Sequence, residues 1–76
     1  MTNYISALRK MSKAQRHSIA YWSIMAIKYG NGSYYCGMSK GRISGFMRAL
    51  QQLDIITTEE RKAVIYRAYD FILRKG

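Results

Sequence analysis

The residues that could carry out chemistry are few in this 76-residue sequence. The only histidine, His17, and the only cysteine, Cys36, have no third group indicated to complete a nucleophile–base arrangement. Glu59 and Glu60 are adjacent, so on a helix they point about 100° apart and do not form an acid/base pair. One thiol, one imidazole and scattered acids also lack any recognised metal-ligand spacing. We therefore expect a protein that is not an enzyme, with no metal site and no cofactor.

A short basic string at residues 39–42, Ser-Lys-Gly-Arg, is predicted to open a helix with Ser39 as its N-cap. The free N–H groups and the partial positive charge of a helix N-terminus suit a phosphate group. Lys40 and Arg42, with Arg48 behind them, add full positive charges to the same region. The sequence therefore predicts phosphate-backbone contacts from Lys40, Arg42 and Arg48.

Glycines and tyrosines surround this string. Gly41 and Gly45 would let a nucleic-acid backbone come close, and Tyr34 and Tyr35 are candidates for stacking on a base or for anchoring a protein interface. A purely structural interpretation stays open as well. In that interpretation the glycines admit a neighbouring helix, the tyrosines fill the edge of the core, and the basic side chains are simply solvated.

A second basic cluster falls across the junction between the first two predicted helices. We expect its side chains to contact nucleic acid or an acidic protein surface, unless they form a solvated helix face: Arg9, Lys10, Lys13 and Arg16. A membrane-surface role would need an amphipathic helix with an exposed apolar side. Because the apolar sides here are better used in a core, no membrane partner is expected.

Periodicity and capping signals predict helices at about residues 3–10, 13–29, 40–53 and 58–75. Ser12 with Gln15, and Thr57 with Glu60, fit capping boxes. Residues 19–27 are almost entirely apolar, so the second helix is predicted to be central and covered on most sides. The glycine-rich segment 30–38 is predicted to be a loop. The expected fold is all-α, a small single-domain bundle of three main helices plus a short N-terminal helix.

Apolar spacing also predicts the inward faces of the last two helices: Ile43, Phe46, Met47, Leu50 and Leu53, then Val64, Ile65, Ala68, Ile72 and Leu73. The short link between these helices has a length that suits a helix-turn-helix motif. The reading helix of that motif would begin with Glu59 and Glu60, which phosphates repel. A standard helix-turn-helix is therefore not expected.

The charge balance points to a polyanionic partner. Thirteen Lys and Arg stand against four Asp and Glu, a net charge of +9, and residues 1–53 contain eight basic side chains and no acid. Such a field attracts nucleic acid or an acidic protein surface. A single cysteine excludes an internal disulfide and no signal sequence is visible, so we expect a cytoplasmic location.

The apolar stretch SIAYWSIMAI and the hairpin-like stretch MRALQQLDIITTEE, in so short a chain, resemble small helical accessory proteins of phages and mobile elements. The resemblance covers about residues 12–73. It implies action by binding rather than catalysis, since such proteins include nucleic-acid-binding regulators, antirepressors and anti-CRISPR inhibitors. For a phage-encoded chain it implies a bacterial host cytoplasm. Many of these inhibitors are acidic and imitate DNA, and this basic chain departs from that pattern.

Three hypotheses follow from the sequence. The first is a nucleic-acid-associated regulatory or accessory protein that grips phosphates through its cationic residues. The second is an inhibitor or adaptor that binds a host or phage protein, with Tyr34, Tyr35 and Arg48 as anchors. The third is a subunit of a larger ribonucleoprotein or virion assembly. The choice between DNA and RNA, and between a monomer and a homodimer, stays open.

Overall fold

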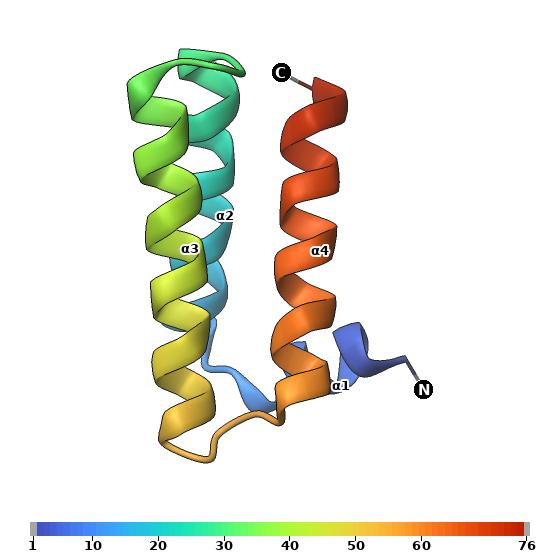
Figure 1. The fold of residues 1–76 in the computed structure, drawn as a ribbon. Helices are drawn as coiled ribbons and strands as arrows, with labels where there is room; N and C mark the ends of the chain where they lie inside the picture. The colour runs from blue at the N-terminus through green and yellow to red at the C-terminus, as the bar shows by residue number, and fades with distance from the viewer. Residues whose placement is uncertain (1, 76) are drawn as a thin grey trace.

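The computed structural model describes residues 2–75, which form four α-helices and no strand (Figure 1). The helices are α1 (Asn3–Lys10), α2 (Lys13–Tyr29), α3 (Tyr34–Gln52) and α4 (Thr58–Lys75). The three long helices run side by side along the molecule, and α1 lies across the end where α4 begins. The predicted all-α class is confirmed.

Local capping fixes the start of α1 and both ends of α2, and the predicted Ser12–Gln15 capping box is confirmed. The Thr2 hydroxyl accepts the Ile5 N–H at 3.2 Å at the start of α1. In the capping box of α2, the Ser12 hydroxyl accepts the Gln15 N–H at 3.1 Å, and the Gln15 amide oxygen accepts the Ser12 N–H at 2.8 Å. Gly30 then ends α2 with φ at +88°, a conformation that glycine adopts without strain.

The predicted start of the third helix at Lys40 is wrong. The helix begins at Tyr34, and Ser33 is its N-cap, with a hydroxyl that accepts the Cys36 N–H at 3.1 Å. Ser39 is a buried position inside the helix, not its cap. Both serines fit a capping position, and the earlier start places Cys36 inside the helix, where it is buried in the core at 1% exposure. Tertiary packing therefore outweighs the weak helix propensity of a glycine-rich segment.

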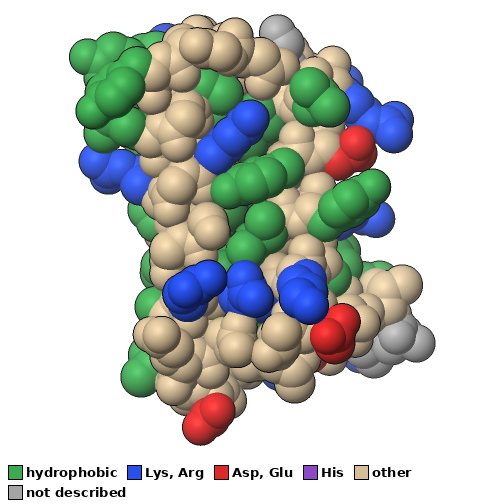
Figure 2. Space-filling model, in the orientation of Figure 1, with side chains coloured by type: hydrophobic (Ala, Val, Ile, Leu, Met, Phe, Trp, Pro, Cys, Tyr) green, Lys and Arg blue, Asp and Glu red, His purple; other side chains and the backbone are tan. Residues whose placement is uncertain are grey.

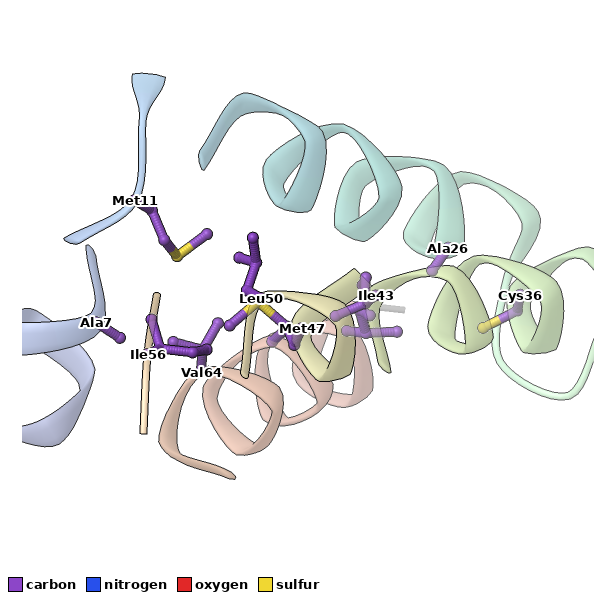
Figure 3. Close-up of a cluster of buried hydrophobic side chains, with 11 residues drawn as sticks. Ala7, Met11, Ala26, Cys36, Ile43, Met47, Leu50, Ile56 and Val64 are labelled. Atoms are coloured by element: carbon purple, nitrogen blue, oxygen red, sulfur yellow. The ribbon is translucent and has the colours of Figure 1, made fainter. Parts of the chain in front are cut away.

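The core collects side chains from all four helices and from the link between α3 and α4. Figure 3 shows Met47 and Leu50 of α3 near Val64 of α4 and Ile56 of the link. The buried residues of the core are Ala7, Met11, Ala26, Cys36, Ile43, Met47, Leu50, Ile56, Val64, Ala68 and Ile72. Ile43, Met47 and Ile72 are completely inaccessible to solvent, so these side chains contribute the largest share of apolar burial.

Three predictions about burial are wrong. The second helix is not covered on most sides, since Tyr21 and Ile24 are each 60% exposed. Leu53 is 71% exposed because it is the C-cap residue, beyond the last turn of α3. Leu73 is 67% exposed because nine residues rotate a helix by about 900°, which places it opposite Val64.

A buried carboxylate joins α1 to the start of α4. Glu60 is only 3% exposed, and its side chain accepts the Thr57 N–H at 2.7 Å in the second predicted capping box. The same carboxylate binds the Lys10 ammonium at 2.9 Å and the Ser6 hydroxyl, both from α1. The hydrogen bond from Ser6 lowers the pKa of Glu60 most, followed by those from Thr57 and Lys10. Together they hold this pKa at about 2, against an ordinary value of 4.5.

This junction predicts acid sensitivity. Because the pKa of Glu60 is lower in the folded than in the unfolded chain, its contribution to stability is present above pH 4.5 and is lost as the pH falls toward 2. Replacing Glu60 by Gln should lower the melting temperature at pH 7 and flatten its dependence on pH between about 5 and 2. Thermal melts followed by circular dichroism across this range measure both effects.

The matched control is Glu59→Gln, because Glu59 is a neighbouring carboxylate whose side chain is 69% exposed. This variant should keep the pH dependence of the parent chain. Equal pH profiles for Glu60→Gln and the parent would contradict the role of the Glu60 junction.

Candidate nucleic-acid interface

Three glycines line the exposed face of α3. Gly37, Gly41 and Gly45 are spaced four residues apart, so they lie one above another along the helix; we call them the glycine strip. A Cβ atom at any of the three positions would meet nothing within 4 Å. The interpretation that Gly41 and Gly45 admit a neighbouring helix of the same chain is therefore wrong.

The three cations predicted from the sequence surround the glycine strip. Lys40 lies on the side of α4, with its ammonium 5.7 Å from the centre of the Tyr69 ring. The Tyr69 hydroxyl also donates a hydrogen bond of 2.9 Å to the Lys40 carbonyl. Arg42 is exposed on the side of α2, where it lines a pocket between α2 and α3. Arg48 is exposed three residues after Gly45, so it continues the line of the strip.

Arg61 of α4 adds a further cation that the sequence analysis did not include. Its guanidinium donates a hydrogen bond to the side-chain oxygen of Gln51, which lies three residues after Arg48 on α3. Arg61 and Arg48 therefore come from different helices to the same region. Figure 2 shows Lys and Arg side chains in a row across the lower half of this face, over α3 and α4. Nothing in the sequence marked Arg61 as a candidate, because it directly follows two glutamates.

The predicted phosphate site at a helix N-terminus is wrong, since α3 begins six residues before Lys40. Lys40 and Arg42 lie inside the helix, where backbone N–H groups donate to carbonyls four residues earlier. The Ser39 position is buried and offers no free cap. What the face retains for an anion is its side-chain charge and the close approach that the glycines allow.

The two candidate tyrosines do not fill the edge of the core. Tyr34 is 76% and Tyr35 is 56% exposed in the first turn of α3. The Tyr35 ring lies 5.0 Å from that of Tyr29 on α2 and 5.5 Å from that of Tyr34. Because offset or tilted aromatic pairs at this separation attract one another, the rings form an exposed aromatic cluster.

The second basic cluster divides into two pairs. Lys10 is bound to Glu60, and the Arg16 guanidinium donates to the carbonyls of Leu8 at 3.0 Å and Met11 at 2.9 Å. These two cations hold α1 in place. The other two, Arg9 and Lys13, are exposed to solvent and stay candidates for a partner contact.

Cys36 is buried beside the end of α2, whereas His17 is exposed near its start. Within residues 2–75 no three His, Cys, Asp or Glu side chains gather into a metal-binding group. None of the helices described is long and apolar enough to cross a membrane.

Comparison of the chain with family models, curated proteins and solved structures finds no match.

The open space around the glycine strip predicts a gain in stability on substitution. Gly41→Ala and Gly45→Ala should each stabilise the fold by about 0.5–1 kcal/mol, because alanine favours the helix and meets no neighbour. For a domain of this size each kcal/mol raises the melting temperature by roughly 4–8 °C, which calorimetry resolves.

Gly32→Ala is the matched control. Its Cβ also meets open space, but Gly32 has φ at +87°, so alanine there should lower the melting temperature. A loss of stability in the two helical variants would show that the glycines serve the fold itself.

Proposed function

We propose that this chain is a single-domain helical bundle that binds nucleic acid through the exposed face of α3, without catalysis. Its role is regulatory or accessory and its location cytoplasmic, in a bacterial host if the chain is phage-encoded. The observation that carries the proposal is the glycine strip, which no part of the fold needs and which lies between Lys40, Arg42 and Arg48.

The glycines support the proposal because they lower the stability of the helix. A glycine inside a helix destabilises it by about 1 kcal/mol relative to alanine. Three such positions without an internal neighbour point to a requirement outside the chain. A sugar–phosphate backbone that runs along the helix is such a requirement, because its close approach needs a surface without side chains. The flanking lysine and arginines then lie within reach of its phosphates.

The pairing of the acidic side chains supports the same conclusion. Glu60 is buried against Lys10, Asp70 lies 3.0 Å from Arg74, and Glu59 lies 4.0 Å from Lys62. Each of these three acids is opposed by a cation close to it, whereas the fourth, Asp54, lies in the link after α3 and forms no ion pair among the described residues. No residue of α1, α2 or α3 carries a carboxylate, so the face of α3 keeps its positive charge. Such a field attracts a polyanion and accelerates its encounter with the protein.

The contribution of the exposed arginines is tested with a double variant. Arg42→Gln/Arg48→Gln should weaken binding of a labelled oligonucleotide on the order of tenfold and reduce the slope of log K against log salt by about 1.5. Fluorescence anisotropy at several salt concentrations measures both quantities. The control Arg74→Gln/Lys75→Gln removes the same charge from the last turn of α4 and should keep the slope nearly unchanged.

The same titrations test the glycine strip. Gly41→Ala/Gly45→Ala should bind more weakly although it is the more stable protein, since the added methyl groups hold the phosphate backbone away. If this variant binds as tightly as the parent, the strip has no part in binding. If no chain in the series binds more tightly than an unrelated protein of equal charge, nucleic acid is not the partner.

A second candidate function, an inhibitor or adaptor that binds another protein, is favoured by a different observation. An apolar groove of about 440 Å³ lies between α1, α2 and α4, and Ile24 and Phe71 on its lining are 60% and 45% exposed. Apolar surface of this kind is typical of protein interfaces. Tyr34, Tyr35 and Arg48 would be further anchors. A protein partner that binds in stoichiometric amount, stays bound after nuclease treatment and at moderate salt, and is released by Ile24→Lys would support this function.

The oligomeric state is tested by size-exclusion chromatography with and without nuclease. It distinguishes a free monomer from a homodimer and from a subunit of a ribonucleoprotein or virion assembly.

A further inference from the structure

A shallow pocket of about 210 Å³ lies between α2 and α3, next to the glycine strip. Aromatic rings form much of its lining, and a single cation, Arg42, stands among them; the rings are Tyr21, Trp22, Tyr29 and Tyr35. Pockets that hold drug-sized molecules usually measure about 300–1,000 Å³. This pocket is smaller and open, and its lining suits one flat ring rather than a larger molecule.

The rings are arranged so that they can accept a stacking partner. Tyr21, Tyr29 and Tyr35 are 60%, 46% and 56% exposed, so each leaves ring surface open to solvent although the ring centres of Tyr29 and Tyr35 lie 5.0 Å apart and the two rings cover part of one another. Trp22 is held from behind by an edge-to-face contact with Phe46, at 5.4 Å between ring centres. A group of exposed aromatic rings on a fixed helical pair is the kind of surface on which single-stranded nucleic acids stack their bases.

The electrostatics of the pocket favour a planar ring that is attached to a negatively charged group. Arg42 is the charged residue of its lining, and residues 1–53 contain no acid to oppose it. A peptide segment would need an acidic group and a flat ring side by side to fit equally well. A nucleotide combines both in one unit, with a base for the rings and a phosphate for the guanidinium.

We propose that the pocket between α2 and α3 takes an unpaired base, which makes the partner a single-stranded nucleic acid. This inference rests on the proposed function and specifies its substrate. The base stacks on Tyr29 and Tyr35, its phosphate contacts Arg42, and the adjoining backbone continues along the glycine strip. In a duplex the bases are paired and stacked inside, so they cannot enter the pocket.

The test compares ligands that share a phosphate backbone and differ in their bases. They are an oligothymidylate, an oligouridylate, an abasic strand of equal length, and a duplex. The base-containing single strands should bind about 5- to 150-fold more tightly than the abasic strand for each base that stacks. Trp22 is the only tryptophan and lies in the pocket, so its fluorescence should change with the base-containing strands and not with the abasic one. The thymidylate and uridylate arms distinguish DNA from RNA as the source of the base.

A variant of the pocket provides the second readout. Tyr35→Leu should lower the affinity for the base-containing strand toward that for the abasic strand, because Tyr29 alone is left to stack, and should leave the affinity for the abasic strand unchanged. Tyr35 is largely exposed, so the variant should fold, which circular dichroism verifies. The matched control is Tyr66→Leu, which removes a 76% exposed tyrosine from α4 and should leave both affinities unchanged.

The outcomes distinguish a failure of this inference from a failure of the proposed function. Equal, strongly salt-dependent binding of base-containing, abasic and duplex ligands would overturn the single-strand inference and leave the proposed function standing. Binding that never exceeds that of a charge-matched protein would overturn both. A protein partner that changes Trp22 fluorescence when no nucleic acid does would assign the pocket to that partner and overturn the inference.

Discussion

The buried carboxylate of Glu60 ties together segments that lie far apart in the sequence. A carboxylate removed from water destabilises a fold unless hydrogen-bond donors and an opposing charge replace the water. For Glu60 these come from the cap of α4 and from Ser6 and Lys10 of α1. As a result α1 lies across the start of α4, where Met11 and Ile56 complete the buried end of the core. The groove and the ends of α2 and α4 that border it depend on this placement.

Short-range signals in the sequence were enough to predict most helix ends. The partners in the Ser12–Gln15 and Thr57–Glu60 capping boxes are three residues apart, so the pattern specifies the bonds without knowledge of the fold. The second role of Glu60 could not be predicted in this way. Its partners in α1 lie 50 and 54 residues earlier, and only the tertiary structure brings them together.

The candidate site was predicted in its charges and missed in its geometry. Lys40, Arg42 and Arg48 were chosen as candidates from residue type, but the glycine-rich segment before them was interpreted as a loop. Local propensity favours that interpretation, and the burial of Cys36 overrides it. The aromatic pocket could not be predicted from the sequence for a related reason. Tyr35 meets Tyr29 only because α3 turns back along α2, and the predicted loop hid this pairing.

The two faces of α3 explain how a helix with three interior glycines persists. Its inner face carries Cys36, Ile43, Met47 and Leu50, each no more than 3% exposed, and their burial outweighs the propensity that the glycines lose. The outer face contributes almost nothing to the core, since even a Cβ there would meet no neighbour. The side chains that stabilise the fold and the surface that is open to a partner therefore lie on opposite sides of α3. A surface that the fold does not need is free to match a partner. Its bare backbone beside positive charge is the reason that we propose a phosphate chain as that partner rather than an apolar protein surface.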